Sequence, residues 1–309
     1  MKKNIEDNQE KTFIRKPDWL KKEIVFSNGN SEMRKKLNSE KLNTVCESAL
    51  CPNKNECYNK ATATFMILGN ICTRNCLFCN VNKGTPDFFE FDREINKIIE
   101  LANYYNYKYV NITSVTRDDL DDYGIDSFCE IAINLKKTNI LTEILIPDLM
   151  NKIYLVDKLI AAQPAVINHN IEMVERLYPE IRSKSNFQTS IELLKYLKEK
   201  KVITKTGFMV GLGETEAERY ELIDLLAELK IDILTIGQYL QPSLKHYPIK
   251  EYLSPYEFEK LKKYAENTGI SVVESGVFVR SSYRSYETYN KYKLFKTENC
   301  SRIQTSNEK

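Results

Sequence analysis

Short apolar runs alternate with longer segments of helical periodicity from about residue 63 onward. Apolar runs of about four to eight residues are typical of buried strands, and apolar positions spaced three and four residues apart are typical of helices. The pattern predicts strands at 64–68, 109–113, 141–146, 165–168, 203–210 and 233–238. It predicts intervening helices at 93–105, 127–137, 151–162 and 187–200. Two capping boxes, Thr215 with Glu218 and Ser254 with Glu257, predict two further helix starts.

Strand–helix units in succession predict an α/β fold whose parallel sheet curves toward a barrel. Six such units are too few for the full eight-stranded barrel, so we expect a partial (βα)6 TIM-like barrel at residues 61–275. Residues 1–60 are expected to form an N-terminal extension with Trp19, Leu20 and Ile24 as apolar anchors, and residues 276–309 a C-terminal tail. Active sites of such barrels lie at the C-terminal ends of the strands, which form the mouth.

Charge and hydropathy exclude several classes of protein. The chain of 309 residues has 45 Lys and Arg against 43 Asp and Glu, a net charge of +2, so we expect no nucleic-acid partner. No apolar run of about 18 residues is present, and the N-terminus MKKNIEDNQEK lacks a signal-peptide core, so no membrane partner is expected. A reducing, cytoplasmic setting follows, in which clustered cysteines are more often metal ligands than disulfides.

Six of the eight cysteines form two triplets. The second triplet follows the first predicted strand with the spacing C-x3-C-x2-C and comprises Cys72, Cys76 and Cys79. Such spacing lets one loop hold three corners of a four-iron cluster and leaves the fourth iron with an open position. The alternative is structural zinc, which requires a fourth Cys or His. The two histidines of the chain, His169 and His246, are far away in sequence.

The first triplet has the spacing C-x4-C-x5-C and comprises Cys46, Cys51 and Cys57. It offers a second set of three thiolates. Two triplets with different spacing, placed next to each other in the sequence, indicate two clusters with different tasks. The other cysteines, Cys129 in a helical pattern and Cys300 in a polar segment, are assigned no role.

The second triplet, placed after the first strand of a partial barrel, resembles the radical S-adenosylmethionine superfamily. This resemblance implies that the open iron binds the amino and carboxylate groups of S-adenosylmethionine. An electron from the cluster then breaks a C–S bond and releases a 5′-deoxyadenosyl radical. Further motifs between about residues 40 and 290 resemble the lipoyl synthase family, and they occur in the order NTVCESALCPNKNECY, TATFMILGNICTRNCLFC, TSVTRDDLDDYG, EILIPD, NHNIE, KTGFMVGLGET, LTIGQYLQPS and VRSSYR.

This second resemblance implies a reaction, its cofactors and its partners. Lipoyl synthases insert two sulfurs, at C6 and C8, into an octanoyl chain carried on a lysine of a lipoyl-domain or H-type carrier protein. The resemblance implies two 4Fe-4S clusters: the second triplet binds the cluster that cleaves S-adenosylmethionine, and the first holds an auxiliary cluster that donates sulfur. A low-potential electron donor and an iron–sulfur carrier that rebuilds the consumed cluster are the other implied partners.

The R-S-S-Y motif of the tail supplies one more implied ligand. Its second serine, Ser282, corresponds to the fourth ligand of the auxiliary cluster, which requires the tail to close over the barrel mouth. An alkoxide is a weaker partner for iron–sulfur chemistry than a thiolate, so it leaves readily when the cluster is dismantled. The alternative is a serine in an ordinary loop. Family members continue the motif with alanine, where this chain has Ser285.

Residues at or near the strand ends are predicted to contact the cofactor: Arg117, Glu143, Asn168, Arg182, Gly211, Gly213 and Gln238. The two glycines allow close backbone approach to an adenosine, but glycines after a strand are also common in turns. Arg117, followed by Asp118 and Asp119, either orients a ligand or belongs to a solvated charge run.

The other predicted contacts have their own alternatives. Glu143 lies within an apolar strand, where a carboxylate needs a partner, either a ribose hydroxyl or an internal Lys or Arg. Arg182 suits bidentate binding of the cofactor carboxylate, or it is a surface arginine. Asn168 lines the mouth together with His169, and Gln238 is expected to contact the adenine.

Two other functions compete with this interpretation. A tRNA methylthiotransferase also pairs two clusters, but it requires a basic RNA-binding module after the barrel. Only about 35 residues follow the barrel here, and the charge of the whole chain is nearly balanced. A non-catalytic iron–sulfur or zinc scaffold leaves the motifs at the barrel mouth without a purpose. Iron and sulfide analysis tests the scaffold alternative, since about eight irons per chain support two four-iron clusters and one zinc supports a scaffold.

Overall fold

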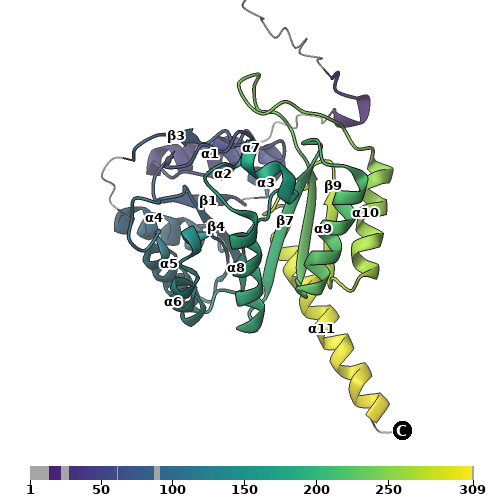
Figure 1. Ribbon diagram of the computed structural model, residues 1–309. Coiled ribbons are helices and arrows are strands. Elements are labelled where there is room, and N and C mark those ends of the chain that lie inside the picture. The colour runs from purple at the N-terminus through teal and green to yellow at the C-terminus, as the bar shows by residue number, and fades with distance from the viewer. Residues whose placement is uncertain (1–13, 22–27, 61, 87–90, 308–309) are drawn as a thin grey trace, which may run out of the picture.

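Among the residues that the structure describes, seven parallel strands form one sheet in the order in which they occur along the chain (Figure 1). The structure is a computed structural model that describes residues 14–21, 28–60, 62–86 and 91–307. The strands of the main sheet are β1 (Thr64–Ile67), β4 (Tyr109–Ser114), β5 (Leu141–Leu145), β6 (Val166–Asn168), β7 (Thr204–Val210), β8 (Ile233–Gln238) and β9 (Val272–Gly276). β2 (Ile71–Cys72) and β3 (Asn82–Lys83) form a small separate sheet.

Each strand of the main sheet pairs with the next one along the chain. Thr64 of β1 lies beside Asn111 of β4, and Lys205 of β7 lies beside Ile233 of β8. In the described chain β1 and β9 are the two ends of this order and do not pair, so the barrel stays open between them. The α/β partial TIM-like barrel is therefore confirmed, with β9 as one strand more than predicted.

Helices cover the outer face of the sheet (Figure 1). Those that follow the strands are α4 (Phe91–Tyr104), α5 (Ile125–Lys137), α6 (Val156–Ala162), α7 (Tyr178–Ile181), α8 (Phe187–Glu199), α9 (Glu216–Glu228) and α10 (Pro255–Asn267). Outward-facing strand residues such as Ile112, Ile144 and Leu234 are buried against them in two hydrophobic clusters. The capping boxes at the starts of α9 and α10 are both present, as predicted.

The start of α6 differs from the prediction. The helix begins at Val156 rather than at residue 151, because the backbone before it is left-handed at Leu149, Met150 and Asn151, with φ of 53°, 47° and 69°. Asp148 accepts a hydrogen bond from the Met150 N–H at 3.2 Å and stabilises this turn. Local hydrogen bonding of this kind competes with the helix.

The N-terminal helices lie over the mouth of the barrel, at the top of Figure 1. They are α1 (Asn28–Glu40), α2 (Val45–Ser48) and α3 (Lys54–Asn59). Of the predicted anchors, Leu20 is buried, and the ring of Trp19 packs edge-on against Tyr252 with centroids 6.5 Å apart. Ile24 lies outside the described residues, as do 1–13 of the extension and 308–309 of the tail.

The C-terminal tail first crosses the mouth and then descends along the barrel interior. Residues 277–283 follow β9 at the mouth, and α11 (Ser285–Asn307) leaves at the opposite end (Figure 1). The ring of Tyr286 stacks on Tyr109 at the start of β4, with centroids 5.4 Å apart. Tyr292 donates a hydrogen bond to Asp232 Oδ1 at 2.8 Å, just before β8. No described helix is long and apolar enough to cross a bilayer.

Candidate active site

The second cysteine triplet lies on the loop between β1 and α4, at the mouth. This loop doubles back on itself, because the Gly84 N–H donates to Cys72 O at 3.0 Å and the Cys79 N–H donates to Cys76 O at 3.2 Å. The pairing of β2 with β3 holds the two ends of the loop together. The three thiols come within electrostatic range of one another, since Cys72 and Cys76 both raise the pKa of Cys79.

The electrostatics of this triplet fit a positively charged inorganic core. Burial raises the pKa of the Cys79 thiol to about 12. Burial also raises the pKa of Cys76, although the positive charge of Arg182 opposes the rise. Thiolates at this position therefore need cations to balance them, and the irons of a cluster supply that charge. Three thiolates on one loop match a four-iron cluster with one open iron.

Arg74, between Cys72 and Cys76, ties the cysteine loop to the ends of two strands. Its guanidinium binds Asp118, after β4, through Nε and Nη2, both at 2.8 Å. It also binds Asp148, after β5, through Nη1 at 2.7 Å and Nη2 at 2.6 Å. Burial alone would raise the pKa of Asp148, but Arg74 holds it well below its usual range. The fork geometry of arginine makes both pairs bidentate, and this fixes the loop.

Arg117 is not part of a solvated charge run. Its side chain is 6% exposed, its Nη2 lies 2.7 Å from Asp119 Oδ2, and its Nη1 donates to Leu68 O at 3.3 Å. It therefore links the ends of β1 and β4. Its contact with a cofactor stays a prediction.

The first triplet is held by α2, α3 and the turn between them. Thr44 caps α2 by accepting from the Glu47 N–H at 3.3 Å, and the Cys51 N–H donates to Cys46 O at 3.1 Å. Burial raises the pKa of Cys46 to about 12, and the nearby Cys51 and Cys57 contribute to the rise. This donor set also fits three corners of a four-iron cluster. No three Cys, His, Asp or Glu side chains of the described chain converge closely enough for a single metal ion.

The R-S-S-Y segment lies against the helices of the first triplet. Asn53 Nδ2 donates to Phe278 O at 2.6 Å, and the Tyr283 hydroxyl donates to Glu56 Oε1 at 3.0 Å. Burial lowers the pKa of Arg280, and the nearby Cys51 opposes this effect. The fold therefore brings residues about 225 positions apart together and places half-buried Ser282 in a segment that contacts α3. Its role as a ligand stays a prediction.

Glu143 has an internal cation as its partner. Lys205 Nζ lies 2.9 Å from Glu143 Oε1 and 3.0 Å from Oε2, and the two side chains are 0% and 2% exposed. The Tyr109 hydroxyl donates to Oε2 at 2.9 Å, and Asn168 Nδ2 donates to Oε1 at 3.1 Å. The contacts favour the internal-cation alternative, so a ribose contact of Glu143 stays a prediction.

Two buried acceptor atoms without partners lie at the end of β6. Asn168 Oδ1 and His169 Nε2 have no hydrogen-bond partner among the described residues. The other ring nitrogen, His169 Nδ1, bonds to Ile146 O at 3.0 Å, and burial lowers the pKa of His169 to about 4, so the ring is neutral. Buried acceptors of this kind fit a ligand with N–H or O–H donors.

Arg182 lies in the wall of the same site. Its side chain is 8% exposed and donates to the Tyr178 hydroxyl at 3.1 Å, so it is not a surface arginine. Its charge acts on Cys76 and on Glu172, whose pKa is raised by burial despite Arg182. The position beside Cys76 suits the carboxylate of a cofactor bound to the open iron, which stays a prediction.

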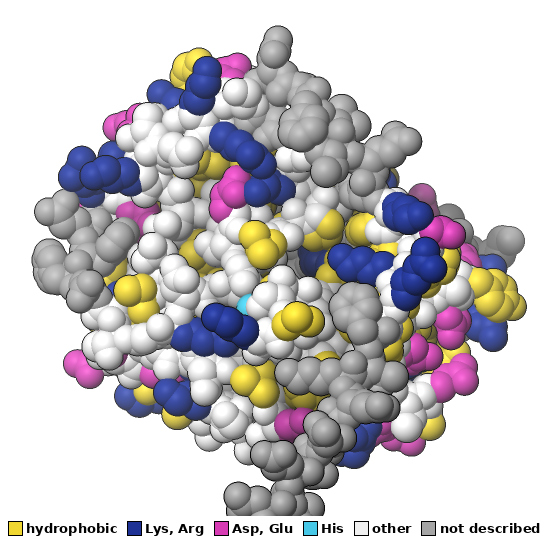
Figure 2. Space-filling view, turned by 90° about the horizontal axis from the view of Figure 1, so that it is seen from above, with side chains coloured by type: hydrophobic (Ala, Val, Ile, Leu, Met, Phe, Trp, Pro, Cys, Tyr) yellow, Lys and Arg dark blue, Asp and Glu magenta, His cyan; other side chains and the backbone are white. Residues whose placement is uncertain are grey.

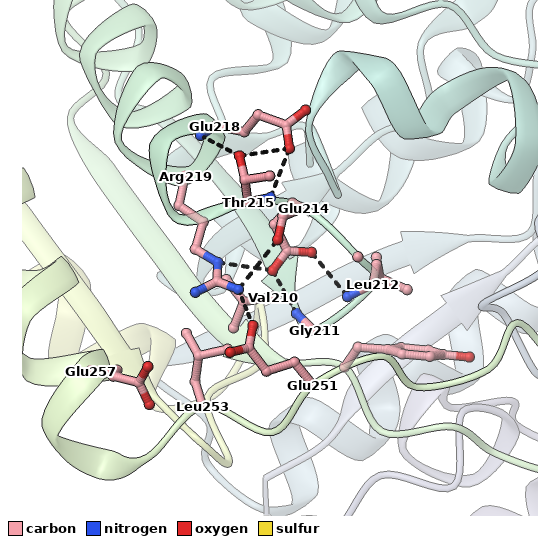
Figure 3. Close-up of polar contacts among 12 residues, drawn as sticks. Val210, Gly211, Leu212, Glu214, Thr215, Glu218, Arg219, Glu251, Leu253 and Glu257 are labelled. Carbon is pink, nitrogen blue, oxygen red and sulfur yellow. Dashed lines mark hydrogen bonds and ion pairs between the residues drawn. The ribbon is translucent and has the colours of Figure 1, made fainter. Parts of the chain in front are cut away.

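The glycine turn after β7 is closed by protein contacts (Figure 3). Gly211 has φ of 93°, and a Cβ there would lie 2.3 Å from both Gln238 Nε2 and Glu251 O. The Glu214 carboxylate accepts the Gly211 N–H at 2.7 Å and the Leu212 N–H at 2.9 Å. These contacts favour the turn alternative for Gly211, and Gly213, with φ of 110°, shares the turn.

The side-chain amide of Gln238 forms hydrogen bonds with backbone groups. Its Nε2 donates to the carbonyls of Val210, Tyr239 and Glu251 at 3.1, 3.2 and 2.9 Å, and its Oε1 accepts the Leu253 N–H at 2.9 Å. The side chain therefore holds the loop before α10. Contact with an adenine stays a prediction, which would require this loop to move.

Sequence reasoning missed Arg74, Asp148 and Glu172. Arg74 lies inside the cysteine motif and is buried. The available signal in the sequence was a charged residue between two predicted cluster ligands. Cys129 is half-buried in α5, and Cys300 lies in α11, where its side chain is not described; neither is assigned a role.

Seen from above, the mouth face carries hydrophobic side chains scattered among basic ones (Figure 2).

A cysteine loop at the mouth of a partial barrel defines the radical SAM class, and residues 66–226 match the family model "Radical SAM superfamily". Membership implies one 4Fe-4S cluster and S-adenosylmethionine as cofactors. The chain belongs, within this superfamily, to the lipoyl synthase family. It is 46% identical over 279 residues to "Lipoyl synthase" of Caldicellulosiruptor saccharolyticus, covering 89% of this chain and 97% of that protein. It is 44% identical over 273 residues to "Lipoyl synthase, mitochondrial" of Nematostella vectensis, covering 87% and 94%.

Solved structures of low identity share the fold alone. Methylornithine synthase (PylB) superposes with a TM-score of 0.54 at 14% identity, covering 82% of this chain and 83% of that one. SuiB of Streptococcus suis, bound to S-adenosylmethionine, gives 0.53 at 16% identity, covering 79% and 61%.

Proposed function

We propose that the chain is a lipoyl synthase that inserts sulfur at C6 and C8 of an octanoyl chain on a lysine of a lipoyl-domain or H-type carrier protein. One observation carries this proposal: two separate triplets of buried or half-buried thiols, each within electrostatic range of its own members, lie at one barrel mouth, and the R-S-S-Y tail packs on the helix of the first triplet. Two triplets fit a reaction that needs both a radical and a source of sulfur. Relatives that cover most of the chain carry the same name.

The residues of the chain divide the work. When bound, the cluster of the second triplet would supply the electron that cleaves S-adenosylmethionine, and the auxiliary cluster of the first would supply sulfur. Arg74 holds the second triplet in register with the strand ends. Arg182, whose charge acts on Cys76, would bind the carboxylate of the cofactor, and the unpartnered acceptors of Asn168 and His169 would receive its ammonium or ribose hydroxyls. Ser282 would complete the coordination of the auxiliary cluster.

The partners follow from the reaction. A carrier protein supplies binding energy that an eight-carbon acid lacks, and it places the chain near the radical. A low-potential electron donor reduces the cluster of the second triplet. If sulfur comes from the auxiliary cluster, an iron–sulfur carrier rebuilds it after each lipoyl group.

Anaerobic incubation with an octanoylated carrier peptide, S-adenosylmethionine and reductant tests the proposal by mass spectrometry. We expect a dithiolated peptide, two molecules of 5′-deoxyadenosine per lipoyl group, and at most about one lipoyl group per chain without an iron–sulfur carrier. Free octanoate should turn over poorly. One zinc per chain, instead of about eight irons, or 5′-deoxyadenosine without any sulfur in the peptide would overturn it.

A further inference from the structure

We propose that Ser281, the first serine of the R-S-S-Y motif, is a positioning residue that fixes the tail so that the adjacent Ser282 can serve as the ligand. This inference rests on the proposed function, because Ser282 is a ligand only if the first triplet holds the auxiliary cluster. It concerns a different residue, and it predicts how the two serines divide their tasks.

The hydroxyl of Ser281 is fully engaged by the end of β6. It accepts a hydrogen bond from Asn168 Nδ2 at 2.7 Å and donates its proton to Asn170 Oδ1 at 3.0 Å. A hydroxyl group has a single proton to donate. Because that proton is held by Asn170, Ser281 is a poor candidate for an alkoxide ligand. In contrast, no hydrogen bond joins the Ser282 hydroxyl to another residue in the described part of the chain, so it is free to bind.

The direction of these bonds is set by a buried ion pair. Lys205 fixes the Glu143 carboxylate, which accepts a hydrogen bond from Asn168 Nδ2. The carboxylate can only accept hydrogen bonds, so the amide of Asn168 must turn its NH2 group toward Glu143. The second N–H of that group then donates to the hydroxyl of Ser281. A chain of directed bonds therefore runs from the barrel interior to the tail. Lys205, Glu143 and Asn168 are buried, and a buried polar group without a hydrogen bond lowers the stability of the fold.

The tail on the other side of Ser282 is also anchored. After Ser282, the Tyr283 hydroxyl donates to Glu56 of α3, and before Ser281 the carbonyl of Phe278 accepts a hydrogen bond from Asn53, the residue that precedes α3. The segment thus has two supports: the barrel through Ser281, and the helix of the first triplet through Tyr283 and Phe278. Ser282 lies between Ser281 and Tyr283, so loss of the bonds of Ser281 leaves the backbone at Ser282 held on one side only.

The test compares four forms of the iron-loaded enzyme in the absence of substrate and S-adenosylmethionine: wild type, Ser281→Ala, Ser282→Ala and the double variant. Iron release to a ferrous chelator and the Mössbauer spectrum of the 57Fe-loaded protein report on the auxiliary cluster. We expect Ser281→Ala to release auxiliary iron about tenfold faster than wild type, since one hydrogen-bonded support is lost. Ser281→Thr, which keeps the hydroxyl, should stay within about twofold of wild type.

The double variant distinguishes positioning from a general structural role. If Ser281 acts through Ser282, the double variant releases iron no faster than Ser282→Ala alone, because coupled residues are not additive. Ser275→Ala is the matched control, since Ser275 of β9 has a partly buried hydroxyl that donates to Phe258 O of α10 at 2.8 Å. An additive double variant, or wild-type release by Ser281→Ala, would overturn the inference. Failure of the proposed function would appear separately, as loss of sulfur insertion by the wild-type enzyme.

Discussion

Arg74 Nη2 lies 2.6 Å from Asp148 Oδ1, although the two residues are 74 positions apart and each side chain is only 2% exposed. The pair joins the loop of the second triplet to the turn after β5. A loop that must hold three ligands at fixed positions gains from such a connection, because supporting contacts determine the geometry of the groups they hold.

Arg74→Met should destabilise the protein strongly, because it leaves Asp118 and Asp148 without their cation. Removing one partner of a buried ion pair lowers the free energy of unfolding by about 3–5 kcal/mol. The matched control is Arg176→Met. The Arg176 side chain is 54% exposed and pairs with Glu218, so we expect a much smaller loss of stability. Anaerobic urea unfolding measures both. Equal shifts for the two variants would contradict a structural role for Arg74.

The ion pair between Glu143 and Lys205 should show strong coupling. Glu143→Gln or Lys205→Met alone leaves a buried charge unpaired and should cost about 3–5 kcal/mol each. The double variant should cost clearly less than the sum, since it removes both charges together. Urea unfolding of the four forms gives the coupling energy. The exposed pair of Lys158 with Asp126 is the control, for which we expect a much weaker coupling because solvent screens the two charges.

Variants of the two triplets should separate radical formation from sulfur insertion. Cys72→Ala should abolish 5′-deoxyadenosine formation. Cys46→Ala should spare it and stop sulfur insertion, because the two triplets are separate donor sets. Chromatography of the nucleoside and mass spectrometry of the peptide provide the two measurements. Full lipoyl formation by Cys46→Ala would leave the first triplet with a structural or electron-transfer role.

Substitutions of Ser282 should affect the product rather than the radical. Ser282→Ala should leave 5′-deoxyadenosine largely intact while the lipoyl product falls sharply. Ser282→Cys replaces an oxygen with a softer thiolate, so it should retain iron and yet impair sulfur release. Iron analysis and product mass spectra are the measurements. Unchanged lipoyl yield in Ser282→Ala would show that this oxygen is not required.

Glu94 should make stability depend on pH near neutrality. Burial raises its pKa from 4.5 to about 7, against the opposing hydrogen bond from the Leu68 N–H at 2.9 Å. Between these values the folded chain keeps the proton that the unfolded chain releases, so stability falls as pH rises from 4.5 to 7. Relative to Glu94→Gln, which cannot titrate, the wild type should lose up to about 3 kcal/mol over this window. Urea unfolding at several pH values checks this, and parallel curves for the two proteins would disprove it.

The alternation of apolar runs was sufficient to predict β1 and β4 through β8, because burial on both faces of a parallel sheet leaves short continuous apolar runs. β9 was missed since only Val272 and Val273 give it apolar character, whereas Glu274 faces Lys291 of α11. α11 itself has no clear apolar face, because it packs on the barrel through tyrosines. The ring of Tyr286 stacks on Tyr109, and the hydroxyl of Tyr292 donates to Asp232.

The spacing of the cysteines identifies both triplets, because ligands on one loop are close in sequence. The partners of Glu143 and Arg74 could not be predicted in this way. Lys205 is 62 positions from Glu143, and only the closure of the sheet brings them together. Likewise, the engagement of Gln238 by the loop before α10 depends on a tertiary contact that its position at a strand end does not reveal.

The contacts of Asn53 with Phe278 and of Glu56 with Tyr283 have a consequence for synthesis of the chain on the ribosome. The segment that carries the first triplet is translated before the barrel, but its last support is translated about 225 residues later. Domains fold progressively from the N-terminus during synthesis. The first triplet therefore stays incompletely enclosed until the whole barrel and the segment after it have been translated. Delivery of iron and sulfide to it is therefore best timed after residues 277–283 have been translated, and a chain that stops before residue 277 should be unable to retain an auxiliary cluster.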